Sequence, residues 1–290
     1  AVNIENIQPF DAEKFTADLF FNHQGRTELF LSSGQKISKK TANTIFVGGS
    51  LNRAKWDENN DEFLDNPLTR LINFMDRIDI RNKKSEAQLS IKYAFEDRIG
   101  GQVKFDNKTD KGTTNAYGFG AKTNRLELAA KNGYFLSGNE FQSLGIQVSG
   151  VYHNMDAFYG LHKYIGKEYN GNLNLIYQNI IKNTNHKIEV GSSFMIDDLS
   201  EQLDSIVLKR TEIVPGIFGE YTYAFLEKIT LLAGIRLDYH NQYGIQFTPR
   251  VHFRYSPTEN TAIRINAGRG WRVSNPIAEN ISLLVSSRNL

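Results

Sequence analysis

Three consecutive segments between Ile229 and Trp271 alternate between apolar and polar residues. The first keeps apolar residues at its odd positions and places Arg236, Asp238 and His240 at even positions. Because successive side chains of a β-strand point to opposite faces, each segment predicts a strand with one apolar face and one polar face. An apolar outer face with an arginine-rich inner face is typical of a membrane-spanning β-barrel.

Similar alternation continues along the whole chain, and no segment shows the pattern of an amphipathic helix. Further strands are expected at 15–21, 27–37, 44–51, 71–80, 88–95, 101–105, 117–130, 144–153, 171–181, 186–196, 206–212 and 216–225. The pattern therefore predicts an all-β, antiparallel protein, in which roughly a dozen strands of about ten residues fit the length.

The predicted connections are of two kinds. Short turns are expected at 23–25 and 226–228, and long polar loops at 52–69, 106–115, 154–170, 197–205 and 273–280. Short turns on the periplasmic side and longer extracellular loops are typical of an outer-membrane barrel. A soluble sandwich or propeller remains an alternative, although its strands would be shorter and its loops more uniform.

Composition excludes several classes of protein. No apolar run approaches the roughly 18 residues of a transmembrane helix, and the mean hydropathy of −0.43 is compatible with strands that face lipid at every second residue. A net charge of only +2 argues against a nucleic-acid partner. The chain has no cysteine, hence no disulfide or thiolate site. No group of residues forms a catalytic constellation, so the chain is not expected to be an enzyme.

Ordered motifs in the carboxy-terminal third carry a family resemblance. The segment from about residue 213 to 288 resembles the barrel of TonB-dependent outer-membrane receptors. The motifs are LLAGIRLDYH at 231–240, FTPR at 247–250, AIR at 262–264, GRGWR at 268–272 and NPIAEN at 275–280. Residues 1–4, AVNI, resemble the strand that closes the family's plug domain.

The resemblance implies that residues 1–290 are the N-terminal half of a receptor β-barrel domain, with residues 1–8 at the end of the plug. We expect a partial transmembrane barrel, about a dozen of the family's roughly 22 strands. No plug domain and no signal peptide are expected within the chain, because the amino terminus lacks a basic start and an apolar core.

The function that the resemblance implies is active uptake of a scarce bulky nutrient across the cell outer membrane. A ferric siderophore, haem or cobalamin would be the substrate. The implied partners are outer-membrane lipid, the receptor's own plug, TonB acting through that plug, and the small-molecule substrate. A passive porin or adhesin barrel and a soluble carbohydrate-binding β-protein remain alternatives.

Five arginines on the polar face of the last strands are candidate contact residues. They could pair with carboxylates of the plug or attract an anionic substrate. Alternatively, they pair with Asp or Glu on neighbouring strands and solvate the lumen. The five are Arg236, Arg250, Arg254, Arg264 and Arg272.

The segment 57–65 is a candidate calcium loop, the one cofactor site that the sequence suggests. Asp57, Asn59, Asp61 and Asp65 have the odd spacing at which calcium loops present oxygen ligands. Against calcium, Glu62 occupies the position where such loops need glycine. A solvated acidic loop explains the same residues.

A third candidate site lies around the expected loop 154–170. His153 and His162 flank this loop, and Tyr159 lies within it. Imidazole and aromatic faces suit a haem or an aromatic siderophore. Aromatic residues of a membrane interface that run into a loop would have the same composition.

Overall fold

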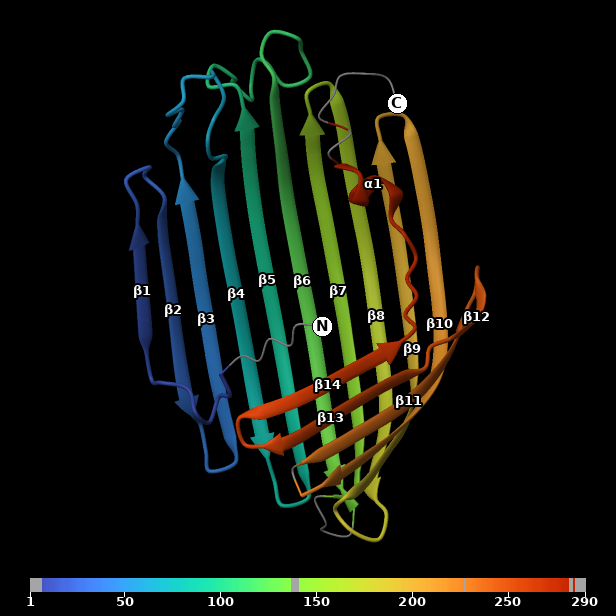
Figure 1. Cartoon of the computed structure of the whole chain (residues 1–290). Coiled ribbons are helices and arrows are strands. Elements are labelled where there is room, and N and C mark those ends of the chain that lie inside the picture. Colours follow the sequence, from blue (N-terminus) through green and yellow to red (C-terminus); the bar gives the residue numbers. More distant parts are fainter. Residues whose placement is uncertain (1–6, 137–140, 227, 282–283, 285–290) are drawn as a thin grey trace.

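The computed structural model of the chain describes residues 7–136, 141–226, 228–281 and 284. These residues form one antiparallel sheet of 14 strands and one short α-helix (Figure 1). The elements are β1 (Thr16–Phe21), β2 (Thr27–Lys36), β3 (Thr41–Asn52), β4 (Leu68–Arg81), β5 (Ser85–Gly101), β6 (Gly118–Phe135), β7 (Ser143–Tyr159), β8 (His162–Ile180), β9 (His186–Leu203), β10 (Ile206–Phe225), β11 (Ile229–His240), β12 (Gly244–Phe247), β13 (Arg250–Thr258), β14 (Thr261–Gly268) and α1 (Pro276–Glu279).

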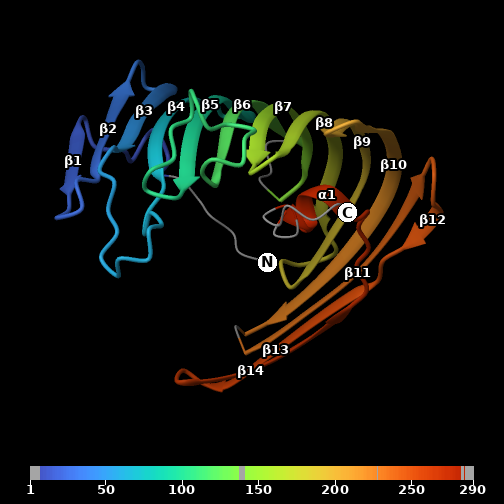
Figure 2. The same ribbon diagram turned by 90° about the horizontal axis from the view of Figure 1, so that it is seen from above.

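The strands follow one another in sequence order, as a chain of hairpins. Each strand from β1 to β11 pairs with the next, β13 then pairs with β11 and β14 with β13, while β12 pairs only with β11. Seen from above, the sheet curves into an open arc whose tilted strands β11, β13 and β14 curl beneath its concave side (Figure 2). Within the described residues, no helix is long and apolar enough to cross a membrane.

The two faces of the sheet differ as the alternation predicted. On β11, Ile235, Leu237 and Tyr239 are exposed, whereas Asp238 and His240 are buried on the opposite face. Similar exposed apolar positions recur along the other strands. A contiguous apolar face this large would be unstable in water, so it is the face that contacts lipid.

The strands of the central wall are taller than the apolar band on their outer face. β5 to β10 are 17 to 20 residues long, whereas about 9–11 residues suffice to cross a bilayer. On β7 the outward apolar positions begin at Leu144 and reach Tyr152, whose ring lies 5.0 Å from that of Tyr169 on β8. Above this aromatic pair the outward positions become polar, as at Asn154 and Lys167. These strands therefore extend beyond the membrane.

This extension corrects two of the expected loops. The segments 154–170 and 197–205 are not loops but the upper ends of strands, joined by two-residue turns at 160–161 and 204–205. Gly160 and Asp204 adopt positive φ values of 59° and 52° in these turns. The loop prediction was wrong because the outward positions above lipid are polar, as at Asn154 and Lys167, so the alternation of apolar and polar residues that marks a strand is lost there.

Other strand boundaries also differ from those expected from the sequence. The expected strands 206–212 and 216–225 form one strand, β10, and residues 102–105, expected to be strand, lie outside β5. Pro215 is tolerated inside β10 because the β10–β11 ladder ends at the adjacent pair Gly216–Asp238. The expected loop 273–280 contains the short helix α1.

Two segments lie on the concave side of the sheet. The amino-terminal segment from residue 7 to β1 crosses it near β2 and β4, where Phe10 packs on the Arg81 guanidinium at 4.3 Å. After β14, the chain runs along the concave face to α1 (Figure 2). We call residues 269–281 the strap. The concave face therefore contacts protein, while the convex face contacts lipid.

Candidate functional site

The strap and the tilted strands enclose a hollow of about 750 Å³ on the concave face. Three of the five predicted arginines line it, Arg236 from β11, Arg250 from β13 and Arg272 from the strap. Carboxylates of Glu212, Glu220 and Asp238 share the lining. The hollow thus contains both signs of charge beside apolar side chains such as Phe218 and Trp271.

The arginines of the sheet in this hollow are paired. The Arg236 guanidinium donates from Nε to Oδ2 of Asp238 at 2.8 Å and from Nη2 to Oγ of Ser193 at 2.7 Å. Arg250 pairs with Glu220 on β10. Gly216 makes room for the first pair, since a Cβ at this position would lie 2.0 Å from Oδ1 of Asp238. Through these contacts Arg236 connects β11 with β9, and Arg250 connects β13 with β10, in each case across the strand between them.

Arg272 closes a turn of the strap. Its Nη1 and Nη2 donate to the two carboxylate oxygens of Glu279 at 2.5 and 2.8 Å, and the Asn275 amide donates to the same carboxylate at 2.8 Å. The hydrogen bonds from Arg272, followed by that of Asn275, lower the pKa of Glu279 to about 2. This pair fixes the shape of the strap.

Arg254 and Arg264 lie apart from this hollow and have no such partners. They face each other across the β13–β14 ladder on the concave face. Within the described part of the chain, neither forms an ion pair with a carboxylate, and Nε of Arg254 is buried without a hydrogen-bond partner. Like charges directly opposite each other are destabilising, and no carboxylate among the described residues neutralises this pair.

The strap packs on the upper wall through contacts that the sequence did not indicate. Ile277 and Ile281 pack with Tyr159 and Tyr164, which are buried at the tops of β7 and β8. The Tyr164 hydroxyl donates to Glu201 at 2.8 Å. The strap is therefore held by an apolar contact beside a buried polar one.

Two hydrogen bonds add to this contact. With its amide nitrogen turned toward Glu201, Asn275 lies 2.8 Å from that carboxylate. Nη1 of Arg210 donates to the Ser274 carbonyl at 3.2 Å. Asn275 and Glu201 are 74 positions apart in the sequence, and Arg210 and Ser274 are 64 positions apart. No rule of residue spacing could have connected either pair.

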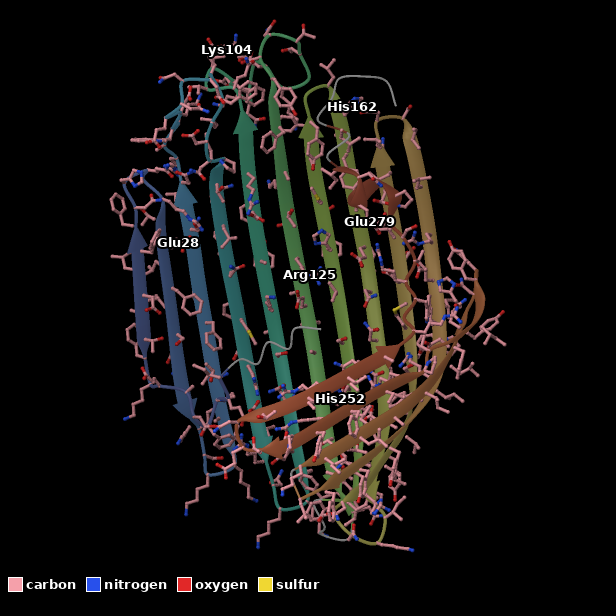
Figure 3. All side chains as sticks on the ribbon, in the orientation of Figure 1. Glu28, Lys104, Arg125, His162, His252 and Glu279 are labelled. Carbon is pink, nitrogen blue, oxygen red and sulfur yellow. The ribbon has the colours of Figure 1, made fainter. Side chains whose placement is uncertain are left out.

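The aromatic candidates do not form one site. His153 lies within β7, opposite Arg125, whereas Tyr159 and His162 are cross-strand neighbours at the tip of the β7–β8 hairpin. Figure 3 shows His162 at the upper rim with Lys104, while Arg125 lies about midway down the wall. Six residues of strand, about 20 Å, separate His153 from Tyr159. Nδ1 of His162 lies 2.8 Å from Oδ2 of Asp204, so this imidazole already has a partner.

The acidic loop uses its oxygens for its own backbone. Oδ2 of Asp57 accepts from the Glu62 amide at 3.0 Å, and Oδ2 of Asp65 accepts from the Glu58 amide at 2.9 Å. Asn59 and Asp61 accept backbone amides in the same way. No group of three or more metal-ligating residues in the described ranges is placed to hold a metal ion. The geometry gives the calcium hypothesis no support.

A buried histidine is a further feature that the sequence did not reveal. His240, fully buried, accepts the Gln242 amide at Nδ1 and directs Nε2 to Glu212 at 3.2 Å. The Trp271 ring of the strap packs on its edge at 5.5 Å. His240 therefore connects the tip of β11 with β10 and the strap.

Comparison with known proteins shows which family has this fold. The family model described as TonB dependent receptor-like, beta-barrel, matches residues 22–284. No curated protein sequence matches the chain.

Solved structures share the fold at low identity. A mutant of the ferric enterobactin receptor from Pseudomonas aeruginosa has a TM-score of 0.68 at 10% identity, with 90% of this chain and 44% of that chain covered. The siderophore receptor PirA from Acinetobacter baumannii has a TM-score of 0.63 at 10% identity, with coverage of 86% and 41%. For the alcaligin outer-membrane receptor from Bordetella pertussis the values are 0.59, 12%, 84% and 40%. The chain thus spans less than half the length of each receptor.

Proposed function

We propose that this chain, which belongs to the TonB-dependent receptor β-barrel family, forms part of the wall of a receptor that imports a bulky anionic iron chelate. The family consists of outer-membrane transporters and not of enzymes. Because the chain belongs to this family, it is not expected to be a soluble carbohydrate-binding protein.

The observation that carries the proposal is the division of the concave arginines. Arg236, Arg250 and Arg272 neutralise carboxylates of the chain itself. Arg254 and Arg264 remain unpaired and face the space that the wall encloses. Acidic side chains of a plug domain would neutralise this pair and hold the plug against the wall.

The substrate class follows from charge and from the structural relatives. Where the plug leaves Arg254 and Arg264 accessible, this pair would attract an anion, and a ferric chelate that carries negative charge fits that requirement. The printed names of the similar solved structures include siderophore and ferric enterobactin receptors. A ferric siderophore is therefore proposed ahead of haem and cobalamin. His153, Tyr159 and His162 are too far apart or too well paired to act as one haem site.

The test is uptake of labelled ferric siderophores by cells that carry the full-length receptor. Uptake should require TonB, and the double variant Arg254→Gln/Arg264→Gln should reduce it at least about tenfold through weakened plug docking. Arg250→Gln is the matched control because its partner Glu220 lies within the wall. Uptake that persists without TonB would indicate a passive porin. Uptake of haem or cobalamin alone would overturn the substrate class.

A further inference from the structure

We propose that the short-turn end of the wall is a binding surface for the phosphate headgroups of anionic phospholipids in the periplasmic leaflet. This end is the lower one in Figure 1, where the fully described turns 37–40, 82–84 and 181–185 are short, whereas the long loops 53–67 and 102–117 lie at the upper end. Short turns mark the periplasmic side of an outer-membrane barrel. We call Lys36, Lys39, Lys40, Lys83, Lys84, Lys182 and Lys228 the basic rim.

The first argument is uncompensated charge. The turns 37–40 and 82–84 contain four lysines and no acidic residue. All seven lysines of the basic rim are exposed, and none forms an ion pair with another described residue. The lysines of adjacent hairpins repel one another unless an anion lies between them.

The second argument is the position of these lysines in the sheet. The Arg81 amide donates to the Lys40 carbonyl at 2.7 Å, which places the β2–β3 turn directly beside the β4–β5 turn. The Phe135 amide donates to the Lys84 carbonyl at 2.8 Å and fixes the second turn against β6. Four cations thus project from two adjoining, rigid turns and not from flexible loops.

The third argument is the aliphatic residue that accompanies the lysines in three turns. Ile37, Ile181 and Leu226 have exposed fractions of 64%, 43% and 70%. Each lies within two residues of a lysine of the basic rim. An exposed aliphatic side chain beside a lysine fits a membrane interface, where the aliphatic part enters the acyl region and the ammonium reaches the phosphates.

The opposite end of the wall shows a different balance of charge. The loop 53–67 contains five acidic residues, and the loop 102–117 contains three lysines beside Asp106 and Asp110. The lysine surplus therefore belongs to the periplasmic end alone. A leaflet rich in zwitterionic lipid would leave it unneutralised, so the complementary partner is an anionic phospholipid such as phosphatidylglycerol.

The test uses the full-length receptor in nanodiscs of phosphatidylcholine that contain a minority of phosphatidylglycerol. Lipids that remain bound after mild delipidation are quantified by mass spectrometry. We expect phosphatidylglycerol to be enriched several-fold over the bulk at low salt and less so at high salt. The variant Lys39→Gln/Lys40→Gln/Lys83→Gln/Lys84→Gln should bring the bound fraction close to the bulk composition.

The matched control is Lys104→Gln/Lys108→Gln/Lys163→Gln/Lys167→Gln, which removes the same charge from exposed positions at the upper end. It should bind phosphatidylglycerol like the parent. Heat-modifiable mobility in gels verifies that both variants are folded; if the fourfold rim variant does not fold, the pairs Lys39→Gln/Lys40→Gln and Lys83→Gln/Lys84→Gln replace it. Equal loss in rim and control variants, or no enrichment in the parent, would overturn the proposal.

Discussion

Two groups of arginines on the same concave face are alike in sequence and unlike in structure. Around the hollow, Arg236 and Arg250 are paired with Asp238 and Glu220 and connect strands. Lower on the tilted strands, Arg254 and Arg264 face each other without a carboxylate. The difference shows that an arginine on a polar strand face stabilises the wall only where a carboxylate of its own strand or of a nearby strand lies within reach.

The largest effect on the paired group should come from Gly216→Val. The new side chain would occupy the place of the Asp238 carboxylate, because even a Cβ lies 2.0 Å from Oδ1. We expect a loss of about 2–3 kcal/mol in the free energy of unfolding, measured by urea titration in detergent or lipid. Gly219→Val is the control on the same strand, where the nearest atom to an added Cβ lies at 3.9 Å. Equal losses in both variants would contradict the role of the paired group.

A smaller loss is expected from Asp238→Ala. Arg236 would retain Ser193 but lose its carboxylate partner, with an expected cost of about 1–2 kcal/mol because the Arg236 side chain is partly exposed. The additional change Arg236→Leu should recover part of the loss, since it removes the unpaired charge. A double variant less stable than the single one would argue that the pair does not act as a unit.

The unpaired group should respond in the opposite way. In the receptor barrel without its plug, Arg254→Gln/Arg264→Gln should leave the free energy of unfolding within about 0.5 kcal/mol of the parent, or raise it slightly by removing repulsion. In the full-length receptor the same variant should reduce resistance of the plug to proteolysis. Destabilisation of the plug-free barrel by more than about 1 kcal/mol, on the order of a lost ion pair, would show that these arginines are structural.

The smallest expected effect concerns the Arg272–Glu279 pair in the strap. The pKa of Glu279 is lowered to about 2 from its ordinary value of 4.5, so the pair is fully formed above pH 4.5 and is lost as pH falls through about 2. The change in Trp271 fluorescence caused by Glu279→Gln, in a Trp56→Phe background, should therefore be the same at every pH from 7 to 3; this comparison cancels any contribution of the adjacent His240. A midpoint between pH 4 and 5 would contradict the pairing.

The sequence predicted the wall well because its signal is local. Alternation along β11 requires only the two-residue period of a strand, and it identified both faces correctly. The tops of β7, β8 and β9 were predicted as loops because their outward positions become polar once lipid no longer contacts them. Local pattern cannot distinguish a tall strand from a loop in that environment.

The contacts of the site depend on register and on long-range packing. Tyr164 and Glu201 are 37 positions apart and meet only through the β8–β9 pairing. The strap reaches Glu201 and Arg210 only because α1 lies on the concave face. Likewise, alternation identified four of the arginines on the polar face of the strands, but it wrongly included Arg272, which lies on the strap after β14, and it could not separate the paired from the unpaired ones.

The most direct test of the account is a cysteine scan through β14, in a receptor whose only cysteine is the introduced one; this chain contributes none of its own. Ile263→Cys, Arg264→Cys and Ile265→Cys are labelled one at a time with an environment-sensitive fluorophore, in full-length receptor reconstituted into liposomes. The account predicts that nitroxide-labelled lipids quench positions 263 and 265, which lie on the convex face, and leave position 264 unquenched. Equal quenching at all three positions, or none at any, would contradict a wall with one lipid face and one lumenal face.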